Sequence, residues 1–125
     1  MELNQRSLDR LVGVHADLVK VVRRAAEISA VVFIVTEGRR TRERQAQLLA
    51  KGASQTLNSR HITGHAVDLA AVVDGEVRWD WPLYYKIAAA MKQAATETGV
   101  AIVWGGDWRT FKDGPHFELD RKAYP

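Results

Sequence analysis

Apolar positions along the chain switch between the spacing typical of helices and the continuous runs typical of buried strands. From Ser7 to Ala26, apolar residues recur at every third or fourth position, which predicts one amphipathic helix capped by the serine. The β-branched run at 30–36 predicts a buried strand. Thr41 is placed to cap a second helix, which Gly52 ends. The first part of the chain is therefore expected to fold as a helix, a strand and a helix.

The second part, after a polar loop expected at 53–64, carries the signals of a hairpin and a third helix. The Asp-Gly pair at 74–75 predicts a tight hairpin turn. A proline near its start and Gly99 at its end bound the third helix. In chain order we expect strands at 65–73 and 76–79, a helix at 83–98, and strands at 100–104 and 116–119. This order predicts an α+β fold, with a small, mostly antiparallel sheet packed with about three helices.

Composition narrows the class of protein. With 46% apolar and 26% charged residues, the chain has the balance of an ordinary globular domain, and we expect a single domain over 1–125. The chain has no cysteine, which excludes a disulfide framework and a thiolate metal site. No apolar run reaches membrane-spanning length, and the first residues lack the pattern of a signal peptide. We therefore expect synthesis in a cytoplasm and no stable membrane insertion.

The distribution of charge raises the possibility of an anionic binding partner. The net charge is +3, and arginines cluster at positions 39, 40, 42 and 44. Such a cluster could attract an anionic partner such as nucleic acid, an acidic wall polymer or an anionic lipid. Exposed positions on the predicted helix explain most of these charges without a partner. A nucleic-acid-binding domain is therefore the weakest of the functional alternatives, and no nucleic-acid partner is expected.

The stretch SRHITGHAVDLAA at 59–71 carries the candidate chemistry. Because side chains alternate between the two faces of a strand, Asp68 stands between two alanines on the face opposite to the core. His61 lies just before this strand. On the last predicted strand, His116 and Glu118 share one face. Two strands are thus expected to bring residues of the metal-ligand type to a common face.

Two imidazoles and one carboxylate form the ligand set of a catalytic zinc site, in which the fourth position is left to water. Nitrogen and oxygen ligands with an open position favour zinc among the divalent metals. Such a site also needs a base, and Asp113, in the turn DGPH, is placed to hold a carboxylate near the metal without becoming a ligand. The alternative is that His61, Asp68 and His116 are three separately satisfied polar residues, which leaves the surrounding glycines and alanines unexplained.

Two motifs give the chain a resemblance to a known family. SRHITGHAVDL is similar to the S-x-H-x-x-G-x-A-x-D signature of the zinc-dependent LAS peptidases, and DGPHFEL is similar to their closing acidic-x-x-His motif. These are motifs of peptidase group M15, and WGGDWRTFKDGPHFEL most resembles its phage L-alanyl-D-glutamate endopeptidase, or endolysin, branch. The resemblance implies a LAS (Hedgehog/DD-peptidase-like) fold, one catalytic Zn²⁺ ion and a single catalytic domain without a separate cell-wall-binding domain.

The resemblance also implies roles for particular residues. His61, Asp68 and His116 correspond to the zinc ligands, and Asp113 corresponds to the catalytic base. The segment TEGRRT resembles the family's Ser-Gly-Tyr-Arg-Ser stretch, which places the functional arginine, a donor to the oxyanion, at Arg40. Two departures stand in this segment, because Glu37 replaces the usual serine and Arg39 replaces the usual aromatic residue. The doubled arginine makes Arg40 the preferred of two candidates.

Three further residues are expected at the site. Glu118 is expected to orient His116, since histidine ligands need a partner on their outer nitrogen. Ser59 matches the serine of the first motif and is expected to contact the substrate or a metal ligand. Trp108 is expected to wall the cleft. His65 falls on the core side of its strand and is expected to be packed or exposed, without binding the metal.

The sequence therefore predicts a zinc peptidase that cuts the stem peptide of bacterial peptidoglycan, between L-Ala and D-Glu. As a phage lysis enzyme it would act as a monomer, made in the host cytoplasm without a signal peptide and reaching the periplasmic wall after the membrane is permeabilised. Two alternatives share the site. One is a D-Ala-D-Ala carboxypeptidase of the same fold, and the other is a non-catalytic zinc module that binds the wall.

Overall fold

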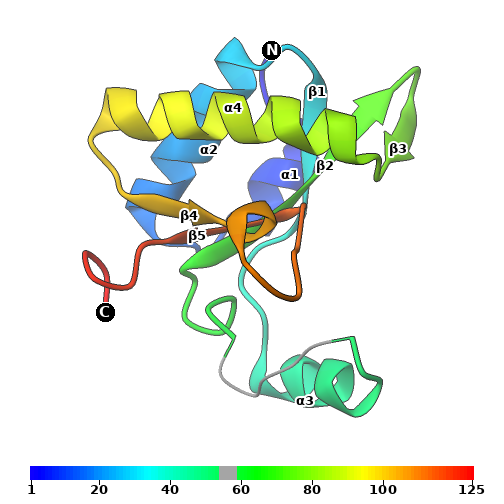
Figure 1. Ribbon diagram of the computed structural model, residues 1–125, viewed down its shortest axis with the longest axis vertical. Coiled ribbons are helices and arrows are strands. Elements are labelled where there is room, and N and C mark those ends of the chain that lie inside the picture. Colours follow the sequence, from blue (N-terminus) through cyan, green and yellow to red (C-terminus); the bar gives the residue numbers. More distant parts are fainter. Residues whose placement is uncertain (54–58) are drawn as a thin grey trace.

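Figure 1 shows the protein as a computed structural model that describes residues 1–53 and 59–125. In chain order its elements are α1 (Gln5–Arg10), α2 (Ala16–Ile28), β1 (Val32–Glu37), α3 (Arg42–Ala50), β2 (Ala66–Val73), β3 (Glu76–Arg78), α4 (Trp81–Thr98), β4 (Ile102–Trp104), the short 3-10 helix η1 (Gly105–Asp107) and β5 (His116–Leu119). The α+β class predicted from the sequence is confirmed. The loop expected at 53–64 includes residues 54–58, which lie outside the described residues.

The strands form one antiparallel sheet in the order β1-β2-β5-β4, and β3 pairs with β2. The register sets Glu37 of β1 and His116 of β5 on either side of Asp68 in β2. Between β1 and β2 the register shifts between Val35 and Glu37, as it does at a β-bulge. Three neighbouring strands therefore hold polar residues in one row across the sheet.

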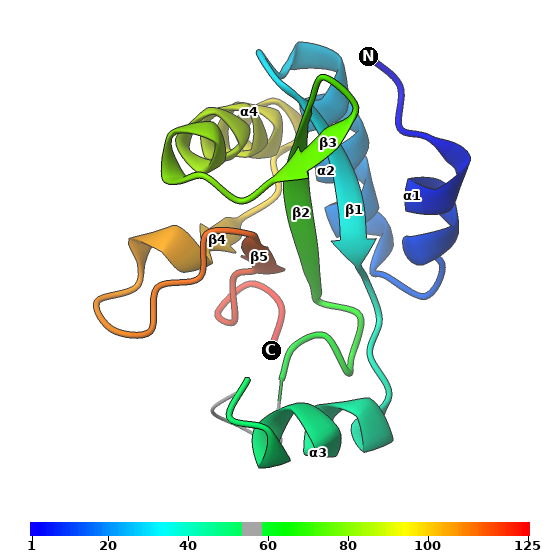
Figure 2. The same ribbon diagram turned by 90° about the vertical axis from the view of Figure 1, so that its right-hand side faces the viewer.

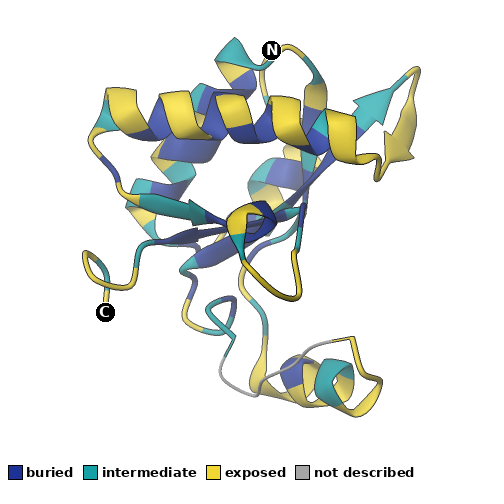
Figure 3. Cartoon of the chain, in the orientation of Figure 1, coloured by how far each residue is buried: buried dark blue, intermediate teal, exposed yellow. Residues whose placement is uncertain are grey.

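The hydrophobic core lies on the opposite face of the sheet, under α2 and α4. These two helices pack against each other, and Figure 3 shows their buried sides turned toward the strands. Leu18 and Met91 of the helices, and Leu69 and Phe117 of the strands, are all fully buried. Burial of one such side chain stabilises the fold by about 1.5–3 kcal/mol. Because Leu69 points into this core, its neighbour Asp68 points to the other face, as the alternation predicts.

The single helix expected from Ser7 to Ala26 is instead two helices, α1 and α2. Asn4 caps α1 by accepting a hydrogen bond from the Ser7 N–H at 2.9 Å, so Ser7 lies inside the helix. The Ser7 hydroxyl accepts from the N–H of Val35 at 2.9 Å and ties α1 to β1. Gly13, in the turn between the two helices, has a φ of 86°, a left-handed conformation that a continuous helix does not contain. The prediction was wrong because the apolar spacing continues across this break.

The expected turns and caps elsewhere are confirmed. Asp74 and Gly75 have φ values of 52° and 78°, as a tight hairpin turn between β2 and β3 requires. Gly99 ends α4 in the left-handed region with a φ of 71°. Thr41 caps α3, because its hydroxyl accepts from the Arg44 N–H at 3.1 Å. Within the described ranges, no helix is long and apolar enough to cross a membrane.

Helix α3 stands apart from the sheet and the other helices, below them in Figures 1 and 2. The chain reaches α3 through Gly38 and returns through Gly64, and both glycines lie against the backbone near α1. A Cβ at Gly38 would collide with the carbonyl oxygen of Arg10, and one at Gly64 would collide with that of Gly13. These close approaches hold both connecting segments beside the sheet, where the candidate site lies.

Candidate metal centre

Asp68 and His116, from the row of polar residues, meet the side chain of His61, which lies before β2. Nε2 of His61 lies 3.2 Å from Oδ1 of Asp68, and Nδ1 of His116 lies 3.4 Å from the same oxygen. One ligand atom from each residue lies within 4.8 Å of the other two. Among the described residues, this is the one group of His, Asp and Glu side chains that could hold a metal ion.

Each histidine is held by a partner on the nitrogen that faces away from Asp68. Nδ1 of His61 donates to the carbonyl oxygen of Gly38 at 2.8 Å, which requires the proton on Nδ1 and leaves Nε2 free to bind a metal. Nε2 of His116 donates to Oε1 of Glu118 at 2.9 Å, which turns Nδ1 toward Asp68. The donor set therefore fits a divalent ion, because both imidazoles are fixed in the tautomer that ligation needs.

Glu118 has the place predicted for a residue that orients His116. It is buried, and its Oε2 lies 3.8 Å from Nε of Arg60 and 3.5 Å from Nε of Arg121. Burial alone would raise the pKa of Glu118, but the hydrogen bond with His116 and the nearby arginines lower it below its ordinary value. Glu118 is therefore a carboxylate that the protein keeps charged beside a candidate ligand.

Without a metal, hydrogen bonds link the charged forms of Asp68 and His116. Burial opposes ionisation of Asp68, but its hydrogen bonds with His116 and His61 hold the pKa of Asp68 far below its ordinary value. Burial also opposes the charged form of His116, yet its bonds to Asp68 and Glu118 raise the pKa of His116 to about 9. A metal ion must therefore displace a proton from His116 at neutral pH.

Asp113 lies on the loop between η1 and β5, at the edge of the same cleft. Its N–H donates to the carbonyl oxygen of Gly105 at 3.0 Å, and its own carbonyl oxygen accepts from the His116 N–H at 3.2 Å. Nε1 of Trp104 donates to the carbonyl oxygen of Gly114 at 2.7 Å and fixes the next residue of the loop. Burial and the charge of Asp68 raise the pKa of Asp113 above its ordinary value. The loop thus presents a carboxylate with the properties of a proton acceptor, outside the ligand group.

The structure places Arg40, and not Arg39, beside the candidate metal centre. The Arg40 side chain is 9% exposed and lines the cleft, and its Nη2 lies 3.9 Å from Oδ2 of Asp68. Arg39 lies against Gly13 instead. The sequence did not predict the partner of Arg40: Nε and Nη2 donate to the two carboxylate oxygens of Glu37, both at 2.6 Å.

Ser59 and Trp108 both line the cleft, and His65 does not. The Ser59 hydroxyl accepts from the His61 N–H at 3.2 Å, so it contacts a candidate ligand through the backbone. The ring of Trp108 lies 5.1 Å from that of His116, centre to centre. His65 instead contacts the Thr63 hydroxyl at 2.6 Å, away from the metal centre. The roles assigned to Ser59 and Trp108 stay predictions.

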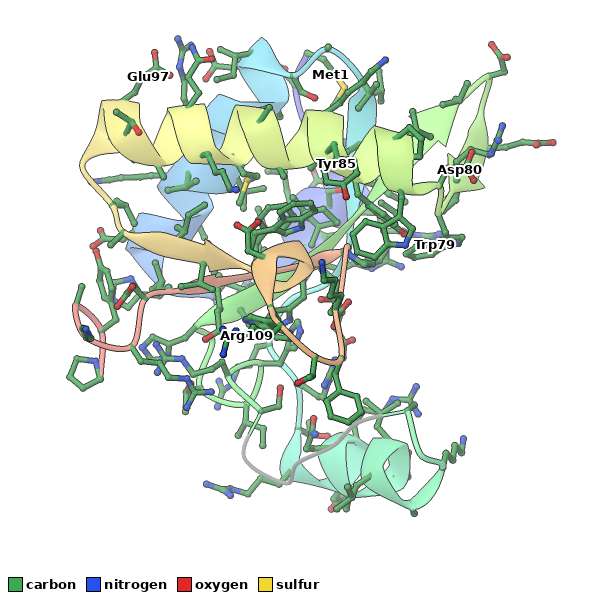
Figure 4. All side chains as sticks on the ribbon, in the orientation of Figure 1. Met1, Trp79, Asp80, Tyr85, Glu97 and Arg109 are labelled. Carbon is green, nitrogen blue, oxygen red and sulfur yellow. The ribbon has the colours of Figure 1, made fainter. Side chains whose placement is uncertain are left out.

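The cleft has a volume of about 770 Å³, and sequence reasoning missed part of its lining. In Figure 4, Arg109 marks the loop that leaves η1, and this loop extends from the sheet in the direction of α3. Phe111 of this loop lines the cleft with 71% of its surface exposed and with a φ of 52°. No spacing in the sequence signals such a residue, because both its exposure and its backbone conformation depend on how the loop folds.

Comparison with known proteins decides the family. Residues 1–124 match the family model described as phage L-alanyl-D-glutamate peptidase. The chain belongs to this family. It is 35% identical to the L-alanyl-D-glutamate peptidase of Escherichia phage T5, over 98% of this chain and 92% of that protein. It is 29% identical to the peptidoglycan L-alanyl-D-glutamate endopeptidase CwlK of Bacillus subtilis, over 90% of this chain and 73% of that protein.

A solved structure confirms the fold of this peptidase family. The L-Ala D-Glu endopeptidase ChiX of Serratia marcescens superposes with a TM-score of 0.95 and 50% sequence identity, covering 100% of this chain and 94% of that chain. The family resemblance read from the two motifs is therefore confirmed. In this peptidase the cleft joins three side chains that could hold a metal ion, a carboxylate of raised pKa and a buried arginine. That combination suits hydrolysis of an amide bond.

Proposed function

We propose that the protein is a zinc-dependent peptidoglycan endopeptidase that hydrolyses the bond between L-Ala and D-Glu in the stem peptide. The observation that carries the proposal is the meeting of His61, Asp68 and His116 in a cleft that also holds Asp113 and Arg40. The names of the phage T5, Bacillus subtilis and Serratia marcescens relatives support the choice of bond.

The ligand set supports zinc as the metal. Two imidazole nitrogens and one carboxylate oxygen, with an open fourth position, are typical of catalytic zinc sites. A bound zinc ion would polarise the scissile carbonyl group and lower the pKa of water at the site. His61 and His116 would each hold the ion through the nitrogen that faces Asp68, while Gly38 and Glu118 keep the two rings oriented.

Asp113 and Arg40 supply the remaining chemistry. The Asp113 carboxylate takes a proton from the attacking water and returns it to the departing amine of D-Glu, a role that its raised pKa favours. Arg40 donates an Nη hydrogen bond to the carbonyl oxygen as negative charge develops there. One such donor contributes about 2.7–4 kcal/mol to stabilisation of the transition state. Ser59 and Trp108 line the path of the substrate.

We further propose that the enzyme acts in phage lysis, made in the host cytoplasm and reaching the periplasmic wall after the membrane is permeabilised. The family match and the phage T5 relative support this setting. One chain supplies every residue of the candidate site, which supports action as a monomer.

The test is mass spectrometry of purified peptidoglycan digested with the zinc-loaded protein. The expected product is the free stem peptide starting at D-Glu, with L-Ala left on the glycan. Removal of the metal with a chelator should abolish digestion, and added Zn²⁺ should restore it. Release of terminal D-Ala would identify a carboxypeptidase instead. Binding of peptidoglycan without any cleavage would identify a wall-binding module.

A further inference from the structure

Glu37 occupies the sheet position next to a candidate metal ligand. It lies in β1 directly opposite Asp68, with His116 on the far side of Asp68 in the same row. Its carboxylate does not join the ligand group. Both of its oxygens instead accept charge-assisted hydrogen bonds of 2.6 Å from Arg40, in the two-pronged geometry that is the strongest an arginine makes with a carboxylate.

The Arg40 side chain donates hydrogen bonds to two residues, Glu37 and Gln45, and lies near a third, Asp68. Nε and Nη2 bind Glu37, and Nη1 donates to the side-chain oxygen of Gln45 at 2.7 Å. Nη2 lies 3.9 Å from Oδ2 of Asp68, which is within reach of an ion pair but too far for a hydrogen bond. Because Oδ1 of Asp68 faces both histidines, Oδ2 is the oxygen nearest the guanidinium. Arg40 is thus bonded to one carboxylate and stands about 1 Å short of bonding a second.

A largely buried cation so close to a ligand opposes the binding of a metal cation. The opposition is strong where water is scarce, because Coulomb interactions grow as the effective dielectric constant falls. Glu37 counteracts it in two ways. Its negative charge compensates that of Arg40, and its two hydrogen bonds restrain the guanidinium from closing on Asp68. Without Glu37, Asp68 would be the carboxylate nearest to the guanidinium of Arg40, a side chain that is only 9% exposed.

We propose that Glu37 is a positioning residue that keeps Arg40 off Asp68, so that Asp68 remains available to the metal and the free Nη hydrogens of Arg40 remain available to the substrate. The inference rests on the metal site of the proposed function. It assigns a role to Glu37, for which the resemblance of the segment TEGRRT implied none.

The test is a cycle of variants in which Zn²⁺ affinity is measured by competition with a chromophoric chelator. Glu37→Gln removes the charge but keeps the shape, and it should weaken Zn²⁺ binding by at least about tenfold. Arg40→Met should bind Zn²⁺ at least as tightly as the wild type. The double variant, which lacks both charges, should return to within about threefold of the wild type. A general loss of structure would not produce this recovery.

Two further variants sharpen the comparison. Glu43→Gln removes an exposed carboxylate at the start of α3 and should leave Zn²⁺ affinity and turnover unchanged. Glu37→Asp keeps the charge and should keep most of the affinity. In turnover of a soluble disaccharide tripeptide, Glu37→Gln should lower kcat by about tenfold or more with little change in KM, because Arg40 acts mainly in the transition state.

The outcomes separate this inference from the proposed function. If the wild type binds no Zn²⁺, the metal site itself is wrong. If the wild type binds Zn²⁺ and Glu37→Gln binds it within twofold of the wild type, only the role of Glu37 is refuted. The role is also refuted if the double variant binds as weakly as Glu37→Gln, because removal of Arg40 then relieves nothing.

Discussion

Nε2 of His116 donates a hydrogen bond of 2.9 Å to Oε1 of Glu118, and this bond turns the other ring nitrogen toward Asp68. The two residues lie two positions apart on β5, so their side chains emerge on the same face of the sheet. A buried carboxylate thus sets the direction in which a candidate histidine ligand points. Against its burial, the bond with His116 and, to a smaller extent, Arg121 and Arg60 hold Glu118 in its charged form.

Replacing Glu118 should therefore weaken metal binding without removing a ligand. We expect Glu118→Gln to lower Zn²⁺ affinity by about tenfold to a hundredfold, because His116 loses a charged partner that fixes its tautomer. Chelator competition measures the affinity. Glu76→Gln, an exposed change on β3, is the matched control and should bind as the wild type does. Equal affinities for the two variants would show that the bond to Glu118 does not tune the site.

The raised pKa of His116 predicts how the metal-free protein responds to pH. A histidine whose pKa rises from 6.5 to about 9 on folding stabilises the folded state fully below pH 6.5, and this contribution is lost as the pH rises through 9. In urea unfolding, the stability difference between wild type and His116→Gln should shrink steadily over that window. A difference that stays constant from pH 6 to pH 10 would contradict the assignment.

The proton that His116 holds below pH 9 should compete with the metal ion for the imidazole. Below pH 9, the apparent Zn²⁺ affinity should rise about tenfold for each unit of pH, with close to one proton released from His116 per ion bound. Calorimetry in buffers of different ionisation enthalpy counts the released protons. Binding without proton release at pH 7 would show that His116 is already neutral.

Asp113 should be needed for turnover and not for metal binding. Asp113→Asn keeps the shape of the side chain but removes the proton acceptor, so kcat should fall by about 10²- to 10⁴-fold. Metal content, measured by elemental analysis, should stay at the wild-type value, because Asp113 lies outside the ligand group. A variant that loses its metal would place Asp113 among the ligands instead.

The sequence predicted the parts of this site that depend on strand alternation and missed those that depend on register. Alternation was enough to bring Asp68 and His116 to one face. The contact between Glu37 and Arg40 requires the bulge in β1 and the turn after it, and neither leaves a periodic signal. The break at Gly13 was missed for a similar reason, because the apolar spacing is the same on both sides of it.

Phe111 offers a way to separate substrate contact from backbone strain. Its ring is exposed at the cleft, and its φ of 52° is uncommon for a residue with a bulky side chain. If the substrate lies against Phe111, Phe111→Ala and Phe111→Gly should both raise KM, since each removes an exposed apolar surface of the cleft. Only the glycine variant relieves the left-handed backbone, so it should be more stable than the alanine variant by about 1–2 kcal/mol in urea unfolding. An unchanged KM in both would remove Phe111 from the binding surface.

Replacing Gly64 should disturb the candidate site as well as the backbone. Gly64 lies three residues after His61 and has a φ of 75°. A Cβ at Gly64 would collide with the carbonyl oxygen of Gly13. Gly75, in the β2–β3 turn, has a similar φ of 78° but open space around it, so Gly75→Ala measures the conformational cost alone, about 1–2 kcal/mol. Gly64→Ala should cost clearly more in urea unfolding and should also weaken Zn²⁺ binding, because relieving the collision moves the segment that carries His61. If the two variants lose equal stability, the contact between Gly64 and Gly13 does not hold the ligand loop in place.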